Sequence, residues 1–107
     1  MRAIRLAAHI LNSTVNDTLQ GGNNDDLICG GAGNDLLHGD NGNDLMSGGA
    51  GDDDLWGMKG NDVLDGGHGQ DVVSGGPGND LVLARDGVRD RVYCGLGQDR
   101  VVADKLD

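Results

Sequence analysis

The sequence contains no Phe and no Glu, and only one Pro, one Trp and one Tyr among its 107 residues. All 18 acidic residues are therefore Asp, a poor helix former, while the good helix former Glu is missing, and this composition excludes a helical bundle. Leu, Ile and Val together make up less than a quarter of the chain, so we expect one domain without a thick hydrophobic core. No run of about 18 apolar residues is present, so we expect no transmembrane helix.

Basic residues are also scarce. Eight Lys and Arg face 18 Asp, which gives a formal charge of -10, and Lys59 is the only Lys or Arg between Leu6 and Ala84. Because so acidic a surface repels phosphate groups, we expect no nucleic-acid partner and no binding to an anionic membrane surface. The apolar stretch within residues 1–11 is too short for a secretory signal and has no small-residue cleavage site, so we expect no cleavable signal peptide. Cys29 and Cys94 form no metal-binding spacing.

Gly, in contrast, is abundant, with 21 residues, and it recurs at a fixed period. Residues 21–83 divide without a gap into seven nonapeptides, which read GGNNDDLIC, GGAGNDLLH, GDNGNDLMS, GGAGDDDLW, GMKGNDVLD, GGHGQDVVS and GGPGNDLVL. Position one is Gly in all seven and position six is Asp in all seven, namely Asp26, Asp35, Asp44, Asp53, Asp62, Asp71 and Asp80. A degenerate copy precedes them at residues 12–20, and after Leu83 the period slips by one residue before residues 94–102 restore it. This organisation predicts an N-terminal cap segment at 1–11, a roll at 12–83, and degenerate repeats with a C-terminal cap at 84–107.

Each unit combines a turn with a short strand. Positions one to six hold turn formers, because Gly adopts positive φ without strain and Asn or Asp tolerates the left-handed region. Positions seven to nine form a strand whose middle residue is always apolar, and alternation turns this residue inward and its neighbours outward. Two units return the chain to its starting edge, so one coil takes 18 residues and the coils stack at about 4.8 Å. The sequence therefore predicts an all-β fold, a parallel β-roll (β-solenoid) of two short-stranded sheets, whose core is formed by Ile28, Leu37, Met46, Leu55, Leu64, Val73 and Val82.

The stacking of coils places the position-six carboxylates in two columns. One column holds Asp17, Asp35, Asp53 and Asp71, and the other holds Asp26, Asp44, Asp62 and Asp80. Two carboxylates about 4.8 Å apart repel by roughly 1 to 3.5 kcal/mol, and this penalty recurs up each column, so a cation must lie between them. Carboxylates and the carbonyls of Gly-rich turns are hard oxygen ligands, which suit Ca²⁺, whereas the N and S ligands of Zn²⁺ are missing. The sequence predicts several calcium ions.

The repeat resembles that of the RTX (repeats-in-toxin, hemolysin-type) family, whose nonapeptide G-G-x-G-x-D-x-U-x forms a right-handed calcium-binding β-roll. The resemblance is strong over residues 21–83 and looser over 12–102. In that family each ion lies between turns two units apart. It binds the carbonyls of positions two and four and the Asp of the lower turn, and the carbonyls of positions one and three and the Asp of the upper turn.

Carried over to this chain, the resemblance implies five sites. The two on one edge would use Gly31, Gly33 and Asp35 with Gly48, Ala50 and Asp53, and then Gly49, Gly51 and Asp53 with Gly66, His68 and Asp71. The three on the other edge would join Asp26 to Asp44, Asp44 to Asp62 and Asp62 to Asp80, with Gly42, Gly57, Gly60 and Gly75 among the carbonyl donors. Asn24 replaces Gly at position four, and Asp40 and Met58 replace Gly at position two. The residues Asp17, Asp90 and Asp99 fall in degenerate units and are left out of the predicted ligand set.

Some side chains outside position six also call for an interpretation. In the run from Asp52 to Asp54 only Asp53 falls at position six, so we expect Asp52 and Asp54 to be solvated residues without a structural role. We expect Trp56 to point outward beside His38 and Ser74. Two interpretations stay open for it, a contact with a partner and a half-covered surface aromatic. About 17 Å along the axis separates Cys29 from Cys94 at the strand spacing, so we expect no disulfide between them.

One outward column is apolar throughout and consists of Leu27, Leu45, Val63 and Leu81, which we call the apolar strip. Such a strip usually marks a contact surface, for a second copy of the chain, a neighbouring domain or the N-terminal segment folding back. We favour segment 1–11 as a cap on the first coil, because the terminal repeat of a solenoid needs its open edge covered.

No Ser/His/Asp, Cys/His or phosphate-loop arrangement stands outside the repeat, and a solenoid of short turns offers no concave pocket, so we expect a calcium-dependent folding and binding module without catalytic activity. The family resemblance implies secretion by bacteria and folding on exit into calcium. Two alternatives stay open. One is a structural or adhesive protein that binds ice, carbohydrate or a partner protein and that calcium only rigidifies, although the regular Thr columns of an ice-binding face are missing. The other is the detached repeat region of a secreted hydrolase.

Overall fold

The computed structural model describes residues 2–5, 14–84 and 90–103, and these residues form eleven β-strands. The strands are β1 (Arg2–Arg5), β2 (Asp17–Gln20), β3 (Leu27–Cys29), β4 (Leu36–His38), β5 (Leu45–Ser47), β6 (Asp54–Trp56), β7 (Val63–Asp65), β8 (Val72–Ser74), β9 (Leu81–Ala84), β10 (Arg91–Tyr93) and β11 (Arg100–Ala103). The described residues include no helix, and therefore none that is long and apolar enough to cross a membrane.

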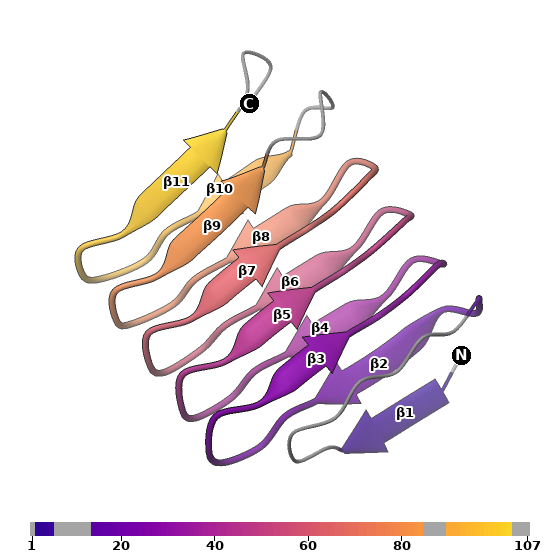
Figure 1. Cartoon of the computed structure of the whole chain (residues 1–107), viewed down its shortest axis with the longest axis horizontal. Coiled ribbons are helices and arrows are strands. Elements are labelled where there is room, and N and C mark those ends of the chain that lie inside the picture. Colours follow the sequence, from indigo (N-terminus) through magenta and orange to yellow (C-terminus); the bar gives the residue numbers. More distant parts are fainter. Residues whose placement is uncertain (1, 6–13, 85–89, 104–107) are drawn as a thin grey trace.

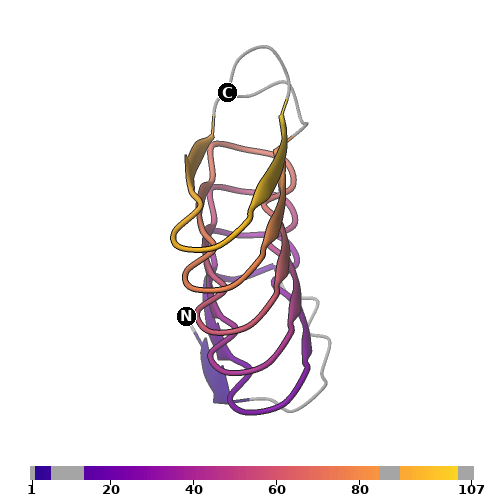
Figure 2. The same cartoon turned by 90° about the vertical axis from the view of Figure 1, so that its left-hand side faces the viewer.

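From β2 onward, successive strands alternate between two sheets. The six-stranded sheet has the order β1-β2-β4-β6-β8-β10, and the five-stranded sheet has the order β11-β9-β7-β5-β3. Every described pairing is parallel, and the partner of Leu45 is Leu27 on one side and Val63 on the other, a register of 18 residues. Figure 1 shows the five-stranded sheet in front of the six-stranded sheet, and Figure 2 shows the coils stacked along the axis. The predicted β-roll with 18 residues per coil is confirmed.

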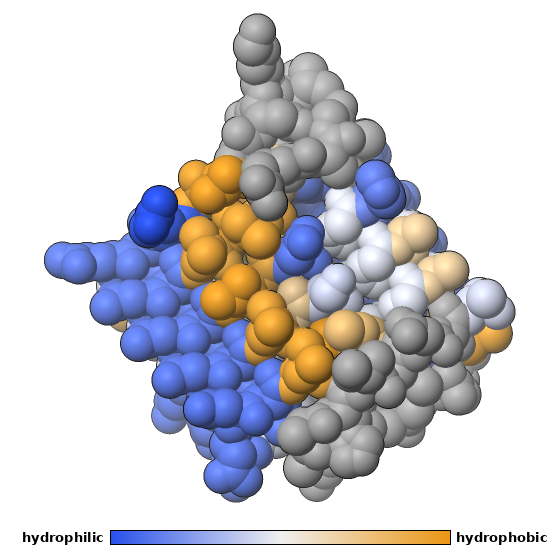
Figure 3. Space-filling model, in the orientation of Figure 1, coloured by the Kyte–Doolittle hydropathy of each residue, from blue (hydrophilic) through white to orange (hydrophobic). Residues whose placement is uncertain are grey.

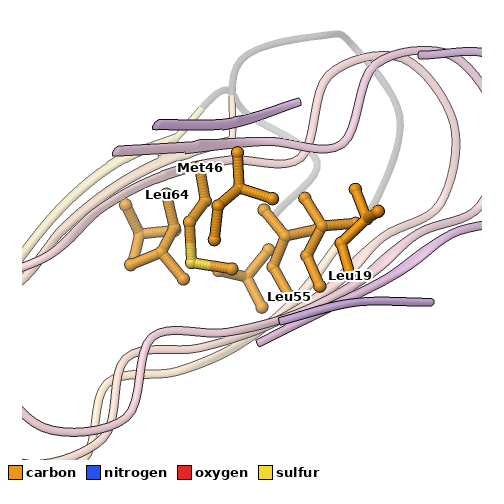
Figure 4. Close-up of a cluster of buried hydrophobic side chains, with 8 residues drawn as sticks. Leu19, Met46, Leu55 and Leu64 are labelled. Atoms are coloured by element: carbon orange, nitrogen blue, oxygen red, sulfur yellow. The ribbon is translucent and has the colours of Figure 1, made fainter. Parts of the chain in front are cut away.

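The core is thin and consists of one row of side chains from each sheet. Its members are the position-eight residues of both sheets, which are at most 1% exposed: Leu19, Ile28, Leu37, Met46, Leu55, Leu64, Val73 and Val82. Figure 4 shows Met46 and Leu64 entering from one layer and Leu19 and Leu55 from the other, so that the two rows face each other between the sheets. Each of the strands β3 to β8 contributes a single buried side chain because a strand of three residues has one inward position. The predicted core is confirmed.

The outer faces of the two sheets differ. On the five-stranded sheet the apolar strip runs across four neighbouring strands, and its most exposed member, Leu45, is 48% exposed. Figure 3 shows hydrophobic side chains gathered on this face, beside the hydrophilic turns. On the six-stranded sheet Trp56 pairs with His38 and Ser74, and the rings of Trp56 and His38 lie 6.0 Å apart. Trp56 is 40% exposed and therefore half-covered on this face, and a partner contact there stays a prediction.

The last coils carry the predicted slip of one residue. The partner of Val72 is Arg91 and the partner of Leu81 is Arg100, a separation of 19 residues in place of 18. Both cysteines are free, as expected. At the other end β1 pairs with β2 and extends the six-stranded sheet by one strand. The predicted caps at 1–11 and 84–107 extend over residues outside the described ranges, and their boundaries stay predictions.

Candidate metal centre

The turns of the roll form two edges that run parallel to the axis. We call the turns that end at Asp17, Asp35, Asp53, Asp71 and Asp90 the first edge, and those that end at Asp26, Asp44, Asp62, Asp80 and Asp99 the second edge. Within a turn the residues at positions two and four have positive φ, for example 86° at Gly31 and 101° at Gly33. Two left-handed residues in a turn of six bend the chain back into the opposite sheet, which explains why Gly recurs at these positions.

The position-six carboxylates are buried in two columns, as the period predicts. The exposed fractions of the predicted ligands Asp26, Asp35, Asp44, Asp53, Asp62, Asp71 and Asp80 lie between 1% and 4%. Within each column the Oδ1 atom of one Asp accepts a hydrogen bond of 2.8 Å from the backbone N–H of the Asp one coil below, as Asp53 does from Asp35 and Asp62 from Asp44. In the six residues from Asp35 to Asp80, one carboxylate oxygen therefore holds successive coils together.

The second carboxylate oxygen differs from the first. The Oδ2 atoms of five of these residues are buried and accept no hydrogen bond from the described part of the chain: Asp35, Asp44, Asp53, Asp62 and Asp80. A buried carboxylate oxygen without a partner is costly, and native proteins satisfy such atoms with a hydrogen-bond donor or a metal ion. These atoms are the direct structural reason to consider a cation at each edge.

The glycine at position one makes room for this oxygen. A Cβ atom on Gly48 would lie 2.5 Å from Oδ2 of Asp53 and 2.7 Å from the carbonyl oxygen of Gly66, one coil above. On the second edge a Cβ on Gly57 would lie 2.6 Å from Oδ2 of Asp62 and 2.8 Å from the carbonyl oxygen of Gly75. The structure thus brings together two of the predicted ligand types, the Asp of a lower turn and the position-one carbonyl of the turn above.

Burial also changes the acidity of these groups. Loss of hydration raises the pKa of Asp53 to about 7, the hydrogen bond from the Asp35 N–H opposes the rise, and the negative charges of Asp35 and Asp52 add to it. For the same leading reason the pKa of Asp62 rises to about 7 and that of Asp44 to about 6. Burial raises the pKa of Asp35 and Asp80 as well. The columns therefore hold charge at neutral pH only at a free-energy cost, which a cation would remove.

Carboxylates alone do not complete a metal site. Among the residues that the structure describes, no three His, Cys or Asp side chains converge on one point, so backbone carbonyls must provide most of the ligands. The carbonyls of Gly31 and Gly49 accept N–H groups of the turn above, from Ala50 at 3.1 Å and His68 at 3.0 Å, and each keeps a second lone pair. Hard carboxylate and carbonyl oxygens in flexible loops fit Ca²⁺, so the residues present suit the predicted ion.

A second ladder of hydrogen bonds, at position five, was not predicted from the sequence. The side-chain Oδ1 of Asn34 accepts the backbone N–H of Asp52 at 2.8 Å, and that of Asp52 accepts the N–H of Gln70 at 2.9 Å. On the second edge Oδ1 of Asn43 accepts the backbone N–H of Asn61, and Oδ1 of Asn61 accepts that of Asn79. The expectation that Asp52 has no structural role was therefore wrong. Asn or Asp at position five in six of the seven units was the signal, but these residues are also ordinary turn formers.

One further expectation needs correction. Asp54 is only partly exposed, and its Oδ1 is buried without a hydrogen bond from any described residue, so it is not simply solvated. Both columns also extend into the degenerate units, because Asp35 accepts the N–H of Asp17, and the N–H groups of Asp71 and Asp80 donate to Asp90 and Asp99, each at 2.8 Å. The columns are longer than the predicted ligand set.

A half-open hollow of about 400 Å³ lies at the end of the first edge and is lined by Gln70, Asp71, Val72, Asp90 and Arg91. These residues include two members of the carboxylate column and no Ser, Cys or His. The expectation that the chain is not an enzyme stays a prediction.

Comparison with known families agrees with the repeat. A family model described as the RTX calcium-binding nonapeptide repeat (4 copies) matches residues 13–46 and 47–82, about two thirds of the chain. No curated protein and no solved structure shows a significant match to the chain.

Proposed function

The chain belongs to the RTX calcium-binding nonapeptide repeat family, and on this premise we propose that it is a module that folds when Ca²⁺ binds between the stacked turns. One observation carries the proposal, namely the buried Oδ2 atoms of Asp35, Asp53 and Asp62, which lack hydrogen-bond partners in the described part of the chain. Each ion would remove the repulsion between two carboxylates and supply the missing partner of at least one of them.

The thin core supports the dependence on calcium. Each of the strands β3 to β8 buries one apolar side chain, whereas the turns between them order six residues each and bury mainly glycine and carboxylate. Ordering the backbone of these turns loses roughly 1 to 2 kcal/mol per residue, which a single buried Leu or Val per unit does not offset. We therefore expect the free energy of ion binding to be folding free energy, as in other small metal-dependent domains.

We expect the module to act outside the cell. Calcium-binding modules of the extracellular space have dissociation constants of about 0.1 to 1 mM, so a chain with such sites stays unfolded in a low-calcium cytosol and folds after export. The family membership supports this location, because the resemblance implies secreted bacterial proteins. We expect no catalytic activity, since the buried side chains of the roll are used for packing and for the columns.

Calcium binding itself is tested by isothermal titration calorimetry of the full chain with Ca²⁺ and, in parallel, with Mg²⁺. We expect saturable binding of several Ca²⁺ ions and much weaker binding of Mg²⁺, which demands an octahedral shell and loses its water reluctantly. A chain that binds no calcium at millimolar concentration, or that binds both ions equally, would contradict the proposed function.

A further inference from the structure

The two edges of the roll differ at their left-handed positions. On the first edge the complete turns 30–35, 48–53 and 66–71 have Gly at both positive-φ positions. On the second edge the first three turns each hold one residue with a side chain there: Asn24 with φ 80°, Asp40 with φ 68° and Met58 with φ 70°. These are all the non-glycine residues with positive φ in the described ranges, so the whole backbone strain of this kind lies on one edge.

Hydrogen bonds between successive turns differ in the same direction. On the first edge the position-two carbonyls of Gly31 and Gly49 each accept an N–H from the turn above. On the second edge the carbonyl of Gly22 accepts the N–H of Asn41 at 3.2 Å, but the structure shows no such bond to the carbonyl of Asp40 or Met58 within the described chain. The residue above Met58 is Pro77, which has no N–H. The second-edge turns that contain Asp40 and Met58 therefore lack a bond to the turn above that the first-edge turns of Gly31 and Gly49 have.

The charges beside the columns do not offset this difference. Beyond position six, the complete first-edge turns contain one charged residue, Asp52, while the second-edge turns contain Asp25, Asp40 and Lys59. Both edges therefore carry the same additional net charge of -1. Burial of the carboxylates is also alike, with Asp53 2% and Asp62 1% exposed, so the backbone decides which edge binds calcium more tightly.

We propose that the two edges form two classes of calcium site, and that the first-edge sites, between Asp35 and Asp53 and between Asp53 and Asp71, fill at lower calcium concentration than the second-edge sites. The inference rests on the calcium function proposed above. An ion at the first edge binds between turns that have no strained residue. An ion at the second edge must also stabilise a strained residue in the lower turn of its site, so part of its binding free energy is used to order that turn. Calcium therefore binds to the roll in two stages.

Asp53 and Asp62 provide a matched pair for the test. Each Oδ1 accepts an N–H from one coil below and each N–H donates to the Asp one coil above, all at 2.8 Å. Substitution by Asn keeps the Oδ1 acceptor and removes the charge. In equilibrium dialysis against Ca²⁺ we expect the parent to show a tight and a weak phase. Asp53→Asn should remove ions from the tight phase, and Asp62→Asn should remove ions from the weak phase while the tight phase persists.

A second pair of variants tests the cause and does not depend on losing a ligand. Asn24→Gly with Met58→Gly relieves two strained residues of the second edge without a change of charge, and we expect the weak phase to move to about fivefold lower calcium. The control is Ala50→Gly with His68→Gly on the first edge, which adds the same number of glycines at position three, where neither residue has positive φ. The control should leave the weak phase where it is.

The outcomes separate this inference from the proposed function. A parent chain that binds no calcium would overturn both. A parent that binds calcium in one uniform phase, with equal losses in Asp53→Asn and Asp62→Asn, would overturn only the division into two classes. Equal shifts in the two glycine double variants would overturn backbone strain as its cause.

Discussion

Replacing Asp53 by Asn should change the stability of the roll in opposite directions with and without calcium. Asp53 is 2% exposed, its Oδ1 accepts the N–H of Asp35 at 2.8 Å, and its Oδ2 has no hydrogen-bond partner among the described residues. Asn has almost the same shape and keeps an acceptor oxygen for the Asp35 N–H, but it carries no charge. The substitution therefore isolates the effect of the buried charge.

Without calcium the variant should be the more stable protein at pH 8. The pKa of Asp53 rises from 3.8 to about 7 in the folded chain, so between these values the folded state binds more protons than the unfolded state, and stability falls as the pH rises. Above pH 7 the whole penalty is present, about 4 kcal/mol at 1.36 kcal/mol per unit. The hydrogen bond from the Asp35 N–H is weaker by about 1 kcal/mol when its acceptor is a neutral amide, so we expect a net gain in the free energy of unfolding of about 3 kcal/mol.

With calcium the sign reverses. Asp53 is shared by the two proposed first-edge sites, with Asp35 and with Asp71, and Asn removes an anionic ligand from both. We expect the calcium concentration at half-folding to rise about tenfold or more, since a tenfold change corresponds to only about 1.4 kcal/mol. Far-UV circular dichroism measures this midpoint. The gain without calcium is measured by the concentration of trimethylamine N-oxide that folds the chelated chain.

Asp52→Asn is the matched control. Asp52 is the neighbouring residue, it is exposed, and its Oδ1 accepts the N–H of Gln70 at 2.9 Å, an interaction that Asn preserves. We expect this variant to change neither measurement by more than about 0.5 kcal/mol. Equal behaviour of the two variants, or a loss of stability in Asp53→Asn under both conditions, would refute the reasoning.

The remaining predictions concern pH, the position-one glycine and the apolar strip. Because the folded pKa values of the columns lie above the unfolded value, the chelated chain should gain β-structure as the pH falls from about 8 to about 5, and an unchanged circular dichroism signal over this range would contradict the columns as the source of instability. Gly48→Ala places a Cβ 2.5 Å from Oδ2 of Asp53 and 2.7 Å from the Gly66 carbonyl, so in saturating calcium it should lower the free energy of unfolding by about 1 to 3 kcal/mol, and a urea midpoint equal to that of the parent would show that the turn can expand. Leu45→Thr with Val63→Thr keeps β-propensity but weakens the apolar strip, and we expect a lower sedimentation mass if a second copy covers the strip or a lower stability at constant mass if the N-terminal segment does; no change in either would mean that the strip is only surface.

The fold could be predicted because one short period determines nearly all of it. Strand length, the inward position and the register of 18 residues all follow from nine residues with one apolar residue always in the same place, and Ile28 and Met46 are buried accordingly. Even the slip of one residue before Arg91 could be predicted, since a solenoid tolerates an insertion in a turn without changing the strands. What lies beyond the repeat, at both ends, has no period to guide a prediction.

The site could be predicted only in part. Position six stood out because Asp there has no substitute, but the ladder through Asn34 and Asp52 depends on which side-chain oxygen meets which N–H one coil away, and sequence spacing does not contain that information. Similarly, the sequence shows that Asp40 and Met58 replace Gly, but not that both retain a positive φ of 68° and 70°. The difference between the two edges therefore became visible only in the structure.

The most direct test of the central claim is far-UV circular dichroism of the full chain at neutral pH, first in chelator, then with Ca²⁺ raised to several millimolar, and finally with chelator in excess again. The buried carboxylate columns predict a largely disordered spectrum in chelator, a β-rich spectrum in calcium and full reversal at the last step, with Mg²⁺ unable to replace Ca²⁺. The same β-rich spectrum and the same thermal midpoint in chelator and in calcium would contradict the claim that cations between the turns hold this roll together.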